Sequence, residues 1–248
     1  HFLPTLKDGK LEWVEAKELK EGDFIAYPKK IPEEFRSQSI RTLTLIPEET
    51  RIYFKNNCSP KIYGNKKYYH SVKLKEIYLD KIDEENIAWI ALGKGGFTDS
   101  YLYRIPKYLN EDILYLKGLI DGDGSYHKNK FNITFVNTEL YLHQEVKRIV
   151  LDNFGISAKT YKNKKYYRNL PQGKPPQNLK DCYTTHINNK LVKIILKNID
   201  AILLSLSNNL IAAWIRGIFD SDGYVASIKN YPKIVITATD ETLNKKIR

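Results

Sequence analysis

Several residue types are scarce or absent in this chain of 248 residues. Methionine does not occur at all, not even at position 1, so we expect the chain to be a trimmed or processed piece of something longer. The two cysteines, Cys58 and Cys182, are too few for a disulfide framework or a cysteine-ligated zinc site. No apolar run is long enough to span a membrane, and the N-terminus does not have the form of a signal peptide. We therefore expect a soluble, cytoplasmic protein with no membrane partner.

Acidic residues are fewer than basic ones. The chain has 40 Lys and Arg residues against 29 Asp and Glu residues, which gives a formal net charge of +11. Such an excess is typical of proteins that bind a polyanion such as nucleic acid, although it does not determine the fold. The length allows one large domain or two ordinary ones.

A nonapeptide occurs twice, as LKGLIDGDG at residues 116–124 and as IRGIFDSDG at residues 215–223. Each copy follows an apolar run and precedes a segment of alternating character, so each predicts a helix that ends at Asp-x-Asp-Gly, with glycine as its C-cap, and leads directly into a strand. The repetition argues against a chance helix cap. An EF-hand loop is excluded because Tyr126 stands where that loop needs glycine and Asn132 where it needs glutamate.

The spacing of small residues predicts how the two helices meet. Gly118 and Gly122 lie on one helix face, the second copy repeats this arrangement, and such a stripe lets two helix backbones approach closely. The C-terminal ends would then bring Asp123 and Asp222 together. Two carboxylates at helix C-termini repel each other and are disfavoured by the helix dipoles. A divalent cation between them, held by oxygen ligands, would relieve this cost.

The nonapeptide resembles the signature of the LAGLIDADG homing endonucleases, in which the last acidic residue of each motif is a metal ligand. The resemblance implies an α+β fold, a pseudo-twofold repeat of αββαββα whose antiparallel sheets form a DNA-binding saddle. It implies Mg²⁺ or another divalent metal at a site formed by Asp123, Asp222, Gly122 and Ser221. The implied partner is double-stranded DNA with a long specific target, bound by a monomer that is an internal pseudo-dimer.

The pattern of the chain fits two such repeats. We expect a first repeat at 106–206 and the start of a second at 207–248, which by comparison with the first copy stops about 60 residues short. In the first repeat, alternation predicts a hairpin at 125–127 and 131–137, and a second strand pair at 157–161 and 182–188. A helix capped by Thr138, with Leu142, Val146, Ile149 and Val150 on its apolar face, is expected between the two pairs, and a final helix is expected from 190 to about 197. In the second repeat, alternation predicts a hairpin at 224–228 and 234–239, with a helix from 240.

Polar residues on the outward side of the predicted strands, and on the basic connection between them, are the candidates for DNA contacts. The same alternation is equally expected of a sheet face exposed only to solvent. The candidates are Asn132, Thr134, Lys159, Tyr161, Lys162, Lys164, Lys165, Arg168, Tyr183 and Thr185.

A lysine is the third expected part of the active site. Intein endonucleases carry one in a Lys-x-Ile-Pro segment before the second motif, and residues 197–200 read Lys-Asn-Ile-Asp. Lys197 is therefore the candidate, although Asp200 replaces the proline and Lys190 and Lys193 are rivals. A lysine near a helix C-terminus also has a purely structural explanation in the helix dipole. The expected catalytic residues are Asp123, Asp222 and Lys197.

The beginning of the chain lies outside the repeat. Residues 8–28, DGKLEWVEAKELKEGDFIAYP, resemble the middle of an intein splicing (Hint) domain, with a hairpin turn at Asp-Gly. On this resemblance residues 1–50 are part of that domain, and His1 assists the first acyl shift. The alternative is a generic small β module with an unrelated terminal histidine. Residues 51–105 are basic and tyrosine-rich, and either contact DNA or form a solvated connector.

Together these features predict an intein-encoded, site-specific DNA endonuclease that makes a double-strand break by metal-dependent phosphodiester hydrolysis. The alternative is a LAGLIDADG-fold nucleic-acid-binding protein, maturase-like or decayed, that does not cleave. A self-splicing element alone is a third possibility that the sequence does not test.

Overall fold

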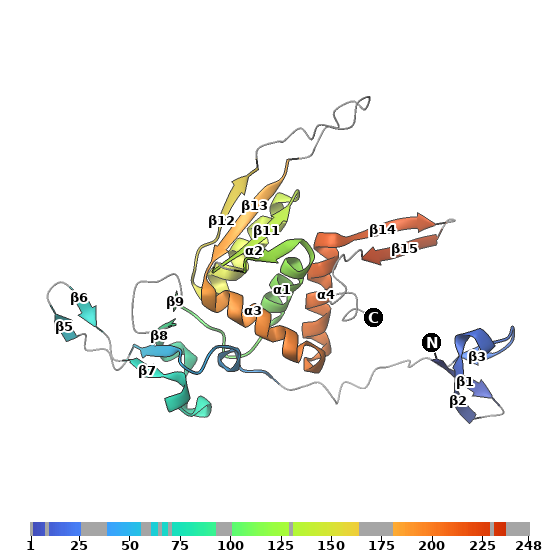
Figure 1. Ribbon diagram of the computed structural model, residues 1–248, viewed down its shortest axis with the longest axis horizontal. Coiled ribbons are helices and arrows are strands. Elements are labelled where there is room, and N and C mark those ends of the chain that lie inside the picture. Colours follow the sequence, from blue (N-terminus) through green and yellow to red (C-terminus); the bar gives the residue numbers. More distant parts are fainter. Residues whose placement is uncertain are drawn as a thin grey trace. The chain divides into compact units, whose positions relative to one another are not determined.

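The computed structural model describes residues 2–7, 10–25, 39–55, 61–63, 66–68, 71–92, 101–128, 131–163, 181–228 and 231–236. Their fold is mixed α+β with antiparallel sheets, as expected (Figure 1). The chain divides into two compact units, 1–37 and 38–248. Within the described ranges, no helix combines the length and apolar character needed to cross a membrane.

The first unit is a small antiparallel sheet. Strands β1 (Phe2–Lys7) and β2 (Lys10–Glu15) pair from Phe2↔Glu15 to Lys7↔Lys10, which confirms the predicted hairpin. A single 3-10 turn, η1 (Ala16–Glu18), follows β2, and β3 (Phe24–Ile25) pairs with β1. His1 and the predicted turn at Asp8 and Gly9 lie outside the described residues.

The basic, tyrosine-rich stretch 51–105 contains a folded sheet that the sequence pattern did not predict. Its strand order is β7-β4-β8-β9, and Ile52, Ile90 and Leu102 on its inner side are fully buried. The turn η3 (Thr42–Leu45) packs on the last helix of the first repeat, so residues 39–50 belong to the second unit. The strands of the stretch are β4 (Arg51–Phe54), β5 (Lys61–Tyr63), β6 (Lys66–Tyr68), β7 (Ser71–Lys73), β8 (Ile87–Ala91) and β9 (Tyr101–Leu102), with 3-10 turns η4 (Leu74–Glu76), η5 (Leu79–Lys81) and η6 (Glu84–Asn86).

The first nonapeptide begins a helix–hairpin–helix–hairpin–helix unit, which confirms the predicted order. Its strands form one antiparallel sheet in the order β10-β11-β13-β12. The predicted cap of the middle helix is wrong, because the residue at its N-cap is Glu139 and not Thr138. The backbone N–H of Glu139 donates to the side-chain oxygen of Asn137 at 2.7 Å. The elements are α1 (Glu111–Asp123), β10 (Gly124–Tyr126), β11 (Asn132–Asn137), α2 (Leu140–Phe154), β12 (Lys159–Lys162), β13 (Tyr183–Asn188), α3 (Lys190–Ile202) and η7 (Leu203–Ser205).

The second nonapeptide begins another helix and hairpin. Helix α4 (Asn208–Asp222) leads directly into β14 (Gly223–Ile228), which pairs with β15 (Tyr231–Ile236). The predicted helix from residue 240 lies outside the described residues. Each motif helix ends at its last aspartate, as predicted, but the C-cap glycines have extended backbones. Residue 124 must be glycine because its backbone passes close to Ile120, and a Cβ at this position would lie 2.6 Å from the Cα of Ile120.

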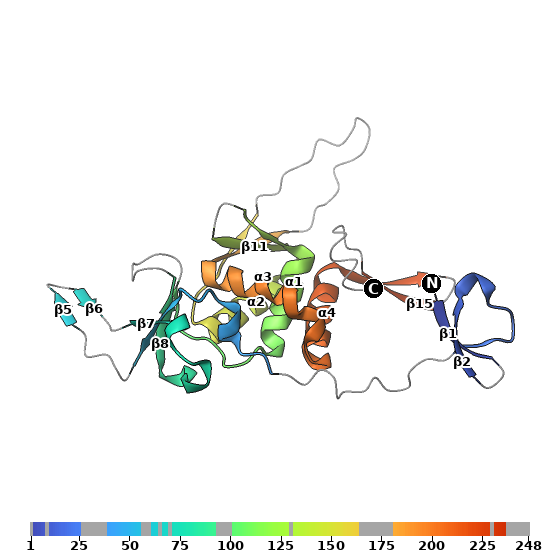
Figure 2. The same cartoon turned by 60° about the horizontal axis from the view of Figure 1, so that its bottom comes forward.

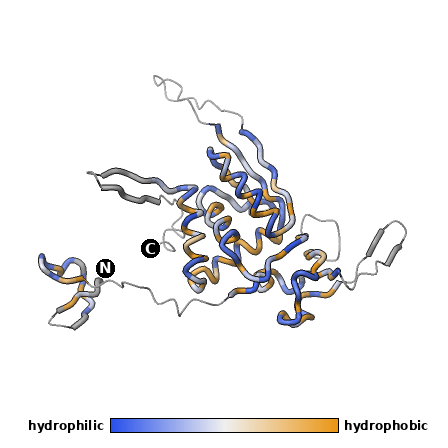
Figure 3. The backbone as a smooth tube through the Cα atoms, turned by 180° about the vertical axis from the view of Figure 1, so that it is seen from behind, coloured by the Kyte–Doolittle hydropathy of each residue, from blue (hydrophilic) through white to orange (hydrophobic). Residues whose placement is uncertain are grey.

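Helix α1 lies at the centre of the second unit. It packs on α4 along its length and contacts α2, β10 and β11 on its other sides, and Figures 1 and 2 both show α1 and α4 side by side. Apolar side chains on the helices meet in a core that also includes Leu43, Ile52 and Ile90. Figure 3 shows this concentration of hydrophobic residues on the helices. The core holds the ends of α1 and α4 in fixed positions.

Candidate active site

The two motif helices touch through glycine. A Cβ at Gly118 would lie 2.9 Å from the Cα of Gly217 and 3.0 Å from the backbone nitrogen of Ile218. Since Cβ atoms do not approach other atoms so closely, any side chain at Gly118 would push the helices apart. One turn further on, Gly122 faces Ser221. The predicted stripe of small residues is therefore the contact that brings the two helix ends together.

Each motif helix also holds the first aspartate of the other motif. The indole nitrogen of Trp214 donates a hydrogen bond of 2.8 Å to Asp121. The Tyr115 hydroxyl donates one of 2.8 Å to Asp220. Trp214 and Tyr115 each stand directly before their own nonapeptide, so the two bonds are reciprocal. The first aspartate of each motif is thus used for helix packing.

The last aspartates of the two motifs, Asp123 and Asp222, lie together at the paired helix ends. Both are half-buried, and their carboxyl groups are close enough to share a hydrogen bond. Asn137, at the end of β11, donates a further hydrogen bond of 2.5 Å to Asp123. Sequence reasoning missed Asn137. The signal available was its place at the end of a strand that leads back toward the motif helix.

The pair titrates abnormally because it is partly removed from water. Burial and the neighbouring Asp222 charge raise the pKa of Asp123 to about 6, while the hydrogen bond from Asn137 opposes the shift. Burial also raises the pKa of Asp222, against the hydrogen bond with Asp123. These directions describe a carboxyl pair that shares one proton, carried by Asp123, below about pH 6. At higher pH two anions face each other at the negative ends of two helices.

The donor set around this pair suits a hard cation. Carboxylates from two helices converge, and the unpaired backbone carbonyls of helix ends are close by. The Ser221 hydroxyl donates to the carbonyls of Gly217 and Ile218, both at 3.0 Å, so its hydrogen is held by the helix backbone. Among the described residues, no group of three or more His, Cys, Asp or Glu side chains forms a metal cluster. A cation here would depend on two carboxylates, backbone carbonyls and water.

The structure places Lys197 against an aromatic ring of the β10–β11 hairpin. Its ammonium lies over the Tyr126 ring, 5.4 Å from the centroid. In the described part of the chain it forms no ion pair with Asp123 or Asp222. Lys193 donates to the backbone carbonyl of His127 at 2.5 Å. Both lysines lie on α3, and both contact the β10–β11 hairpin.

Asp200, which replaces the proline of the intein segment, has a partner. It forms an ion pair of 2.9 Å with Lys117, whose side chain is 1% exposed and is also paired with Asp121. Lys117 itself stands where the family signature has alanine. Two departures from the family pattern thus contact each other, and the aspartate compensates the buried lysine charge.

The outer side of the β10-β11-β13-β12 sheet carries polar side chains from all four strands. Ser125, Thr134, His186 and Lys159 form one row across it, because each pairs with the next in the strand register. Neighbouring positions on the same side hold the predicted Asn132 and Tyr161, with Thr184 and His186 as residues that the sequence reasoning missed.

Three other residues predicted to contact DNA do not lie in this outward-facing polar set. Thr185 is fully buried on the opposite, helix-facing side of the sheet, bonded to His143 and Thr160. Tyr183 shares that side, with its ring 5.8 Å from that of His143. Because Ile187 is buried on β13, residues 185 and 183 share its side and 186 and 184 face outward. Lys162 pairs with Asp181 at 2.6 Å, and Lys164, Lys165 and Arg168 lie outside the described residues.

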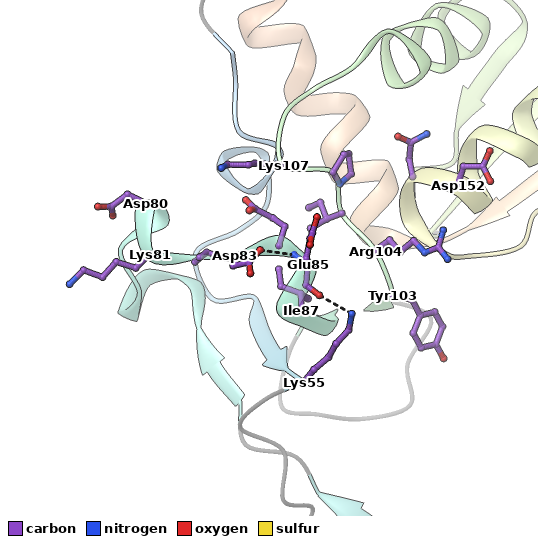
Figure 4. A pocket seen from close by; sticks show the side chains of 15 residues that line it. Lys55, Asp80, Lys81, Asp83, Glu85, Ile87, Tyr103, Arg104, Lys107 and Asp152 are labelled. Atoms are coloured by element: carbon purple, nitrogen blue, oxygen red, sulfur yellow. Dashed lines mark hydrogen bonds between the residues drawn. The ribbon is translucent and has the colours of Figure 1, made fainter.

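A hollow of about 740 Å³ lies between the turns η5 and η6, residues 103–107 and the end of α2 (Figure 4). It mixes charges of both signs, and some of its groups are used internally. Glu84 pairs with Arg41, and the Lys55 ammonium donates to the backbone carbonyl of Glu85 at 2.7 Å. A polyanion would meet Asp80, Asp83, Glu85 and Asp152 here, so this hollow does not fit the partner that the net charge suggests.

Comparison with protein families agrees with the paired motif helices. A family model described as a LAGLIDADG-like domain matches residues 110–200 and 209–248. The chain therefore belongs to the LAGLIDADG-like domain family, whose members are typically DNA-binding nucleases.

Individual relatives have names that share no function. The chain is 27% identical over 244 residues to a probable translation initiation factor IF-2 of Methanocaldococcus jannaschii, covering 90% of this chain and 20% of that protein. It is 25% identical over 283 residues to the reverse gyrase of the same organism, covering 100% of this chain and 16% of that protein. It is 26% identical over 132 residues to a subunit of the A-type ATP synthase of Methanopyrus kandleri, covering 52% of this chain and 11% of that protein. The chain thus spans a fifth or less of the length of these curated relatives.

Proposed function

We propose that this chain is an intein-encoded, site-specific DNA endonuclease that makes a double-strand break by metal-dependent phosphodiester hydrolysis. The observation that carries the proposal is the pair Asp123 and Asp222 at the ends of two glycine-packed motif helices. A protein that only binds DNA has no need to keep two repelling carboxylates beside a polyanion.

Mg²⁺ or another divalent metal fits the donor set, with Asp123, Asp222 and the backbone carbonyls of Gly122 and Ser221 as its ligands. Such an ion, when bound, makes water nucleophilic and stabilises charge on the phosphate. The chain's own contribution is to hold the two carboxylates at a fixed separation, through the Gly118–Gly217 contact and the hydrogen bond from Asn137.

The DNA would lie across the outer side of the four-stranded sheet. Ser125, Thr134, His186 and Lys159 offer donors and acceptors suited to base edges and phosphates, and Asn132, Tyr161 and Thr184 extend the set. The reciprocal Trp214–Asp121 and Tyr115–Asp220 bonds support a pseudo-twofold relation between the repeats. A monomer with an internal pseudo-dimer would then contact a long target without a second copy of the chain.

The intein context is supported by the relatives. Similar stretches occur in proteins whose names place them in translation, DNA topology and ATP synthesis, and they make up only part of each. An element inserted into unrelated hosts would give this distribution. The N-terminal three-stranded unit is compatible with part of a splicing domain.

A binding protein without cleavage is the second candidate. The contact of the Lys197 ammonium with the Tyr126 ring, rather than an ion pair with Asp123 or Asp222 among the described residues, favours it. A lysine that stabilises the transition state is expected near the reacting phosphate. If Lys197 moves there when DNA binds, Lys197→Ala should lower the single-turnover rate by about 10²-fold with little change in affinity.

The experiment that separates the candidates uses a plasmid carrying the uninterrupted allele of the gene that contains this coding sequence. The endonuclease proposal predicts linearisation at one position in Mg²⁺ and none in EDTA. Tight binding of the same DNA with no cleavage in Mg²⁺ or Mn²⁺ would support the binding protein instead.

A further inference from the structure

A row of buried polar groups crosses the helix-facing side of the sheet, where apolar side chains would be expected. The Thr160 and Thr185 hydroxyls lie 2.7 Å apart, and Thr185 lies 2.7 Å from Nδ1 of His143. Thr185 and His143 are fully buried. Polar groups in such a place destabilise a fold unless every one is bonded, so their presence calls for an explanation.

The acceptor at the end of the row fixes the direction of its bonds. Nε2 of His143 lies 3.2 Å from the backbone carbonyl of Asn137, which can only accept, so Nε2 carries the proton. Nδ1 must then accept from the Thr185 hydroxyl, whose oxygen accepts from Thr160. Burial lowers the pKa of His143, which agrees with a neutral ring. All groups in the row are bonded in one consistent arrangement.

Asn137 connects this row to the carboxylate pair. Its carbonyl accepts from His143, its side-chain oxygen accepts from the N–H of Glu139 at 2.7 Å, and its amide nitrogen donates to Asp123 at 2.5 Å. The main chain and the side chain of Asn137 are therefore both held. The amide has little freedom to point away from Asp123 while these contacts persist.

We propose that His143 is a positioning residue that fixes Asn137, and through it the Asp123 carboxylate, and that links Asp123 to strands β12 and β13. The residues on either side of Thr160 and Thr185 point outward on the sheet: Lys159, Tyr161, Thr184 and His186. The consequence for cleavage rests on the proposed function, whereas the positioning of Asn137 does not.

Three variants and a control isolate this role. His143→Leu removes both bonds of the ring. His143→Gln can restore a donor toward Asn137 and an acceptor toward Thr185, and Thr185→Val breaks the link to β12 while leaving His143 on Asn137. Val146→Ala, one turn away on α2 and fully buried, destabilises the same helix without touching the row.

The first readout needs no DNA. In ¹⁵N-correlated NMR spectra of the full chain, assigned by loss of the signal in Asn137→Ala, the Asn137 side-chain amide should show the shifted proton of a donor to a carboxylate. His143→Leu should move this pair of signals toward free-amide values, His143→Gln should restore them, and Val146→Ala should leave them in place. Unchanged signals in His143→Leu would overturn the proposal.

The second readout is single-turnover cleavage on the uninterrupted allele. His143→Leu should lower the rate about tenfold or more with DNA affinity within about twofold, since small misplacements of a catalytic group have effects of this size. His143→Gln should recover most of the rate, and Thr185→Val should fall between the two. Equal losses in His143→Leu and Val146→Ala with no rescue by glutamine would overturn the proposal. If the wild type cuts no DNA but the NMR signals respond as stated, the endonuclease proposal fails and the positioning role stands.

Discussion

Two pairs of aspartates lie two residues apart on the same helices and have opposite surroundings. In the upper pair, Asp121 and Asp220 each accept a hydrogen bond from an aromatic residue of the other helix. In the lower pair, Asp123 and Asp222 face each other, and only Asn137 donates to them from elsewhere among the described residues. The difference teaches that the upper pair stabilises the helix packing, whereas the lower pair is left able to bind something positive.

The largest effect should come from neutralising the lower pair. Asp222→Asn should reduce single-turnover cleavage by about 10³-fold or more, because it removes half of the carboxylate pair. DNA affinity should not fall, since an anion is removed beside phosphates. Asp220→Asn makes the same charge change two residues earlier and should cut at close to the wild-type rate. Equal loss in both variants would remove the distinction between the pairs.

The glycine contact that brings the pairs together should be the most sensitive point for stability. Gly217→Ala places a methyl group against the backbone of α1, so the helices must separate. We expect a loss of about 3 kcal/mol, typical of overpacking in a rigid core. Ile215 on α4 is 40% exposed, so Ile215→Ala should lower the free energy of unfolding much less when both variants are compared by urea titration. A small loss in Gly217→Ala would mean that the helix ends are not held as close as described.

The buried lysine beside the upper pair gives a third test. Lys117→Ala leaves Asp121 buried without its ion-pair partner, so we expect a loss of about 2 kcal/mol. Lys117→Ala combined with Asp200→Ala should lose less than the sum of the two single changes, by about 0.5 kcal/mol or more. Strict additivity in chemical denaturation would mean that Asp200 does not compensate Lys117.

The smallest effect concerns pH. Because the pKa of Asp123 is raised to about 6, the folded metal-free chain binds a proton that the unfolded chain has already lost above about pH 4. Stability should therefore fall as pH rises from about 4 through 6, by about 1 kcal/mol after allowance for solvent screening at this half-buried site. Asp123→Asn should remove this part of the slope. Parallel pH profiles for the two proteins would contradict the raised pKa.

The sequence predicted the motif helices well because the repeated nonapeptide combines several signals at once. Glycine spacing, the Asp-x-Asp-Gly end and the alternation after it all favour the same helix, turn and strand, and the helix ends and the Gly118–Gly217 contact follow from them. The helix α2 was predicted from the apolar spacing of Leu142, Val146 and Ile149, all of which are buried. Local patterns of this kind need no knowledge of distant contacts.

Contacts between distant segments could not be read in this way. The ion pair between Lys117 and Asp200 joins positions 83 residues apart, and nothing local marks either as a partner. The outward side of β13 was assigned one residue out of step, because the register with β11 depends on both strands. The sheet formed by β7, β4, β8 and β9 was missed since its strands are short and separated by connections of nine or more residues.

The measurement that tests the central claim most directly is calorimetric titration of the wild-type chain with Mg²⁺ and Mn²⁺ in the absence of DNA, at pH 7.5, above the raised pKa of Asp123. The account predicts a binding heat in the wild type that is retained in Asp220→Asn and lost in Asp123→Asn and Asp222→Asn. Equal binding in all four proteins, or binding lost only in Asp220→Asn, would contradict it.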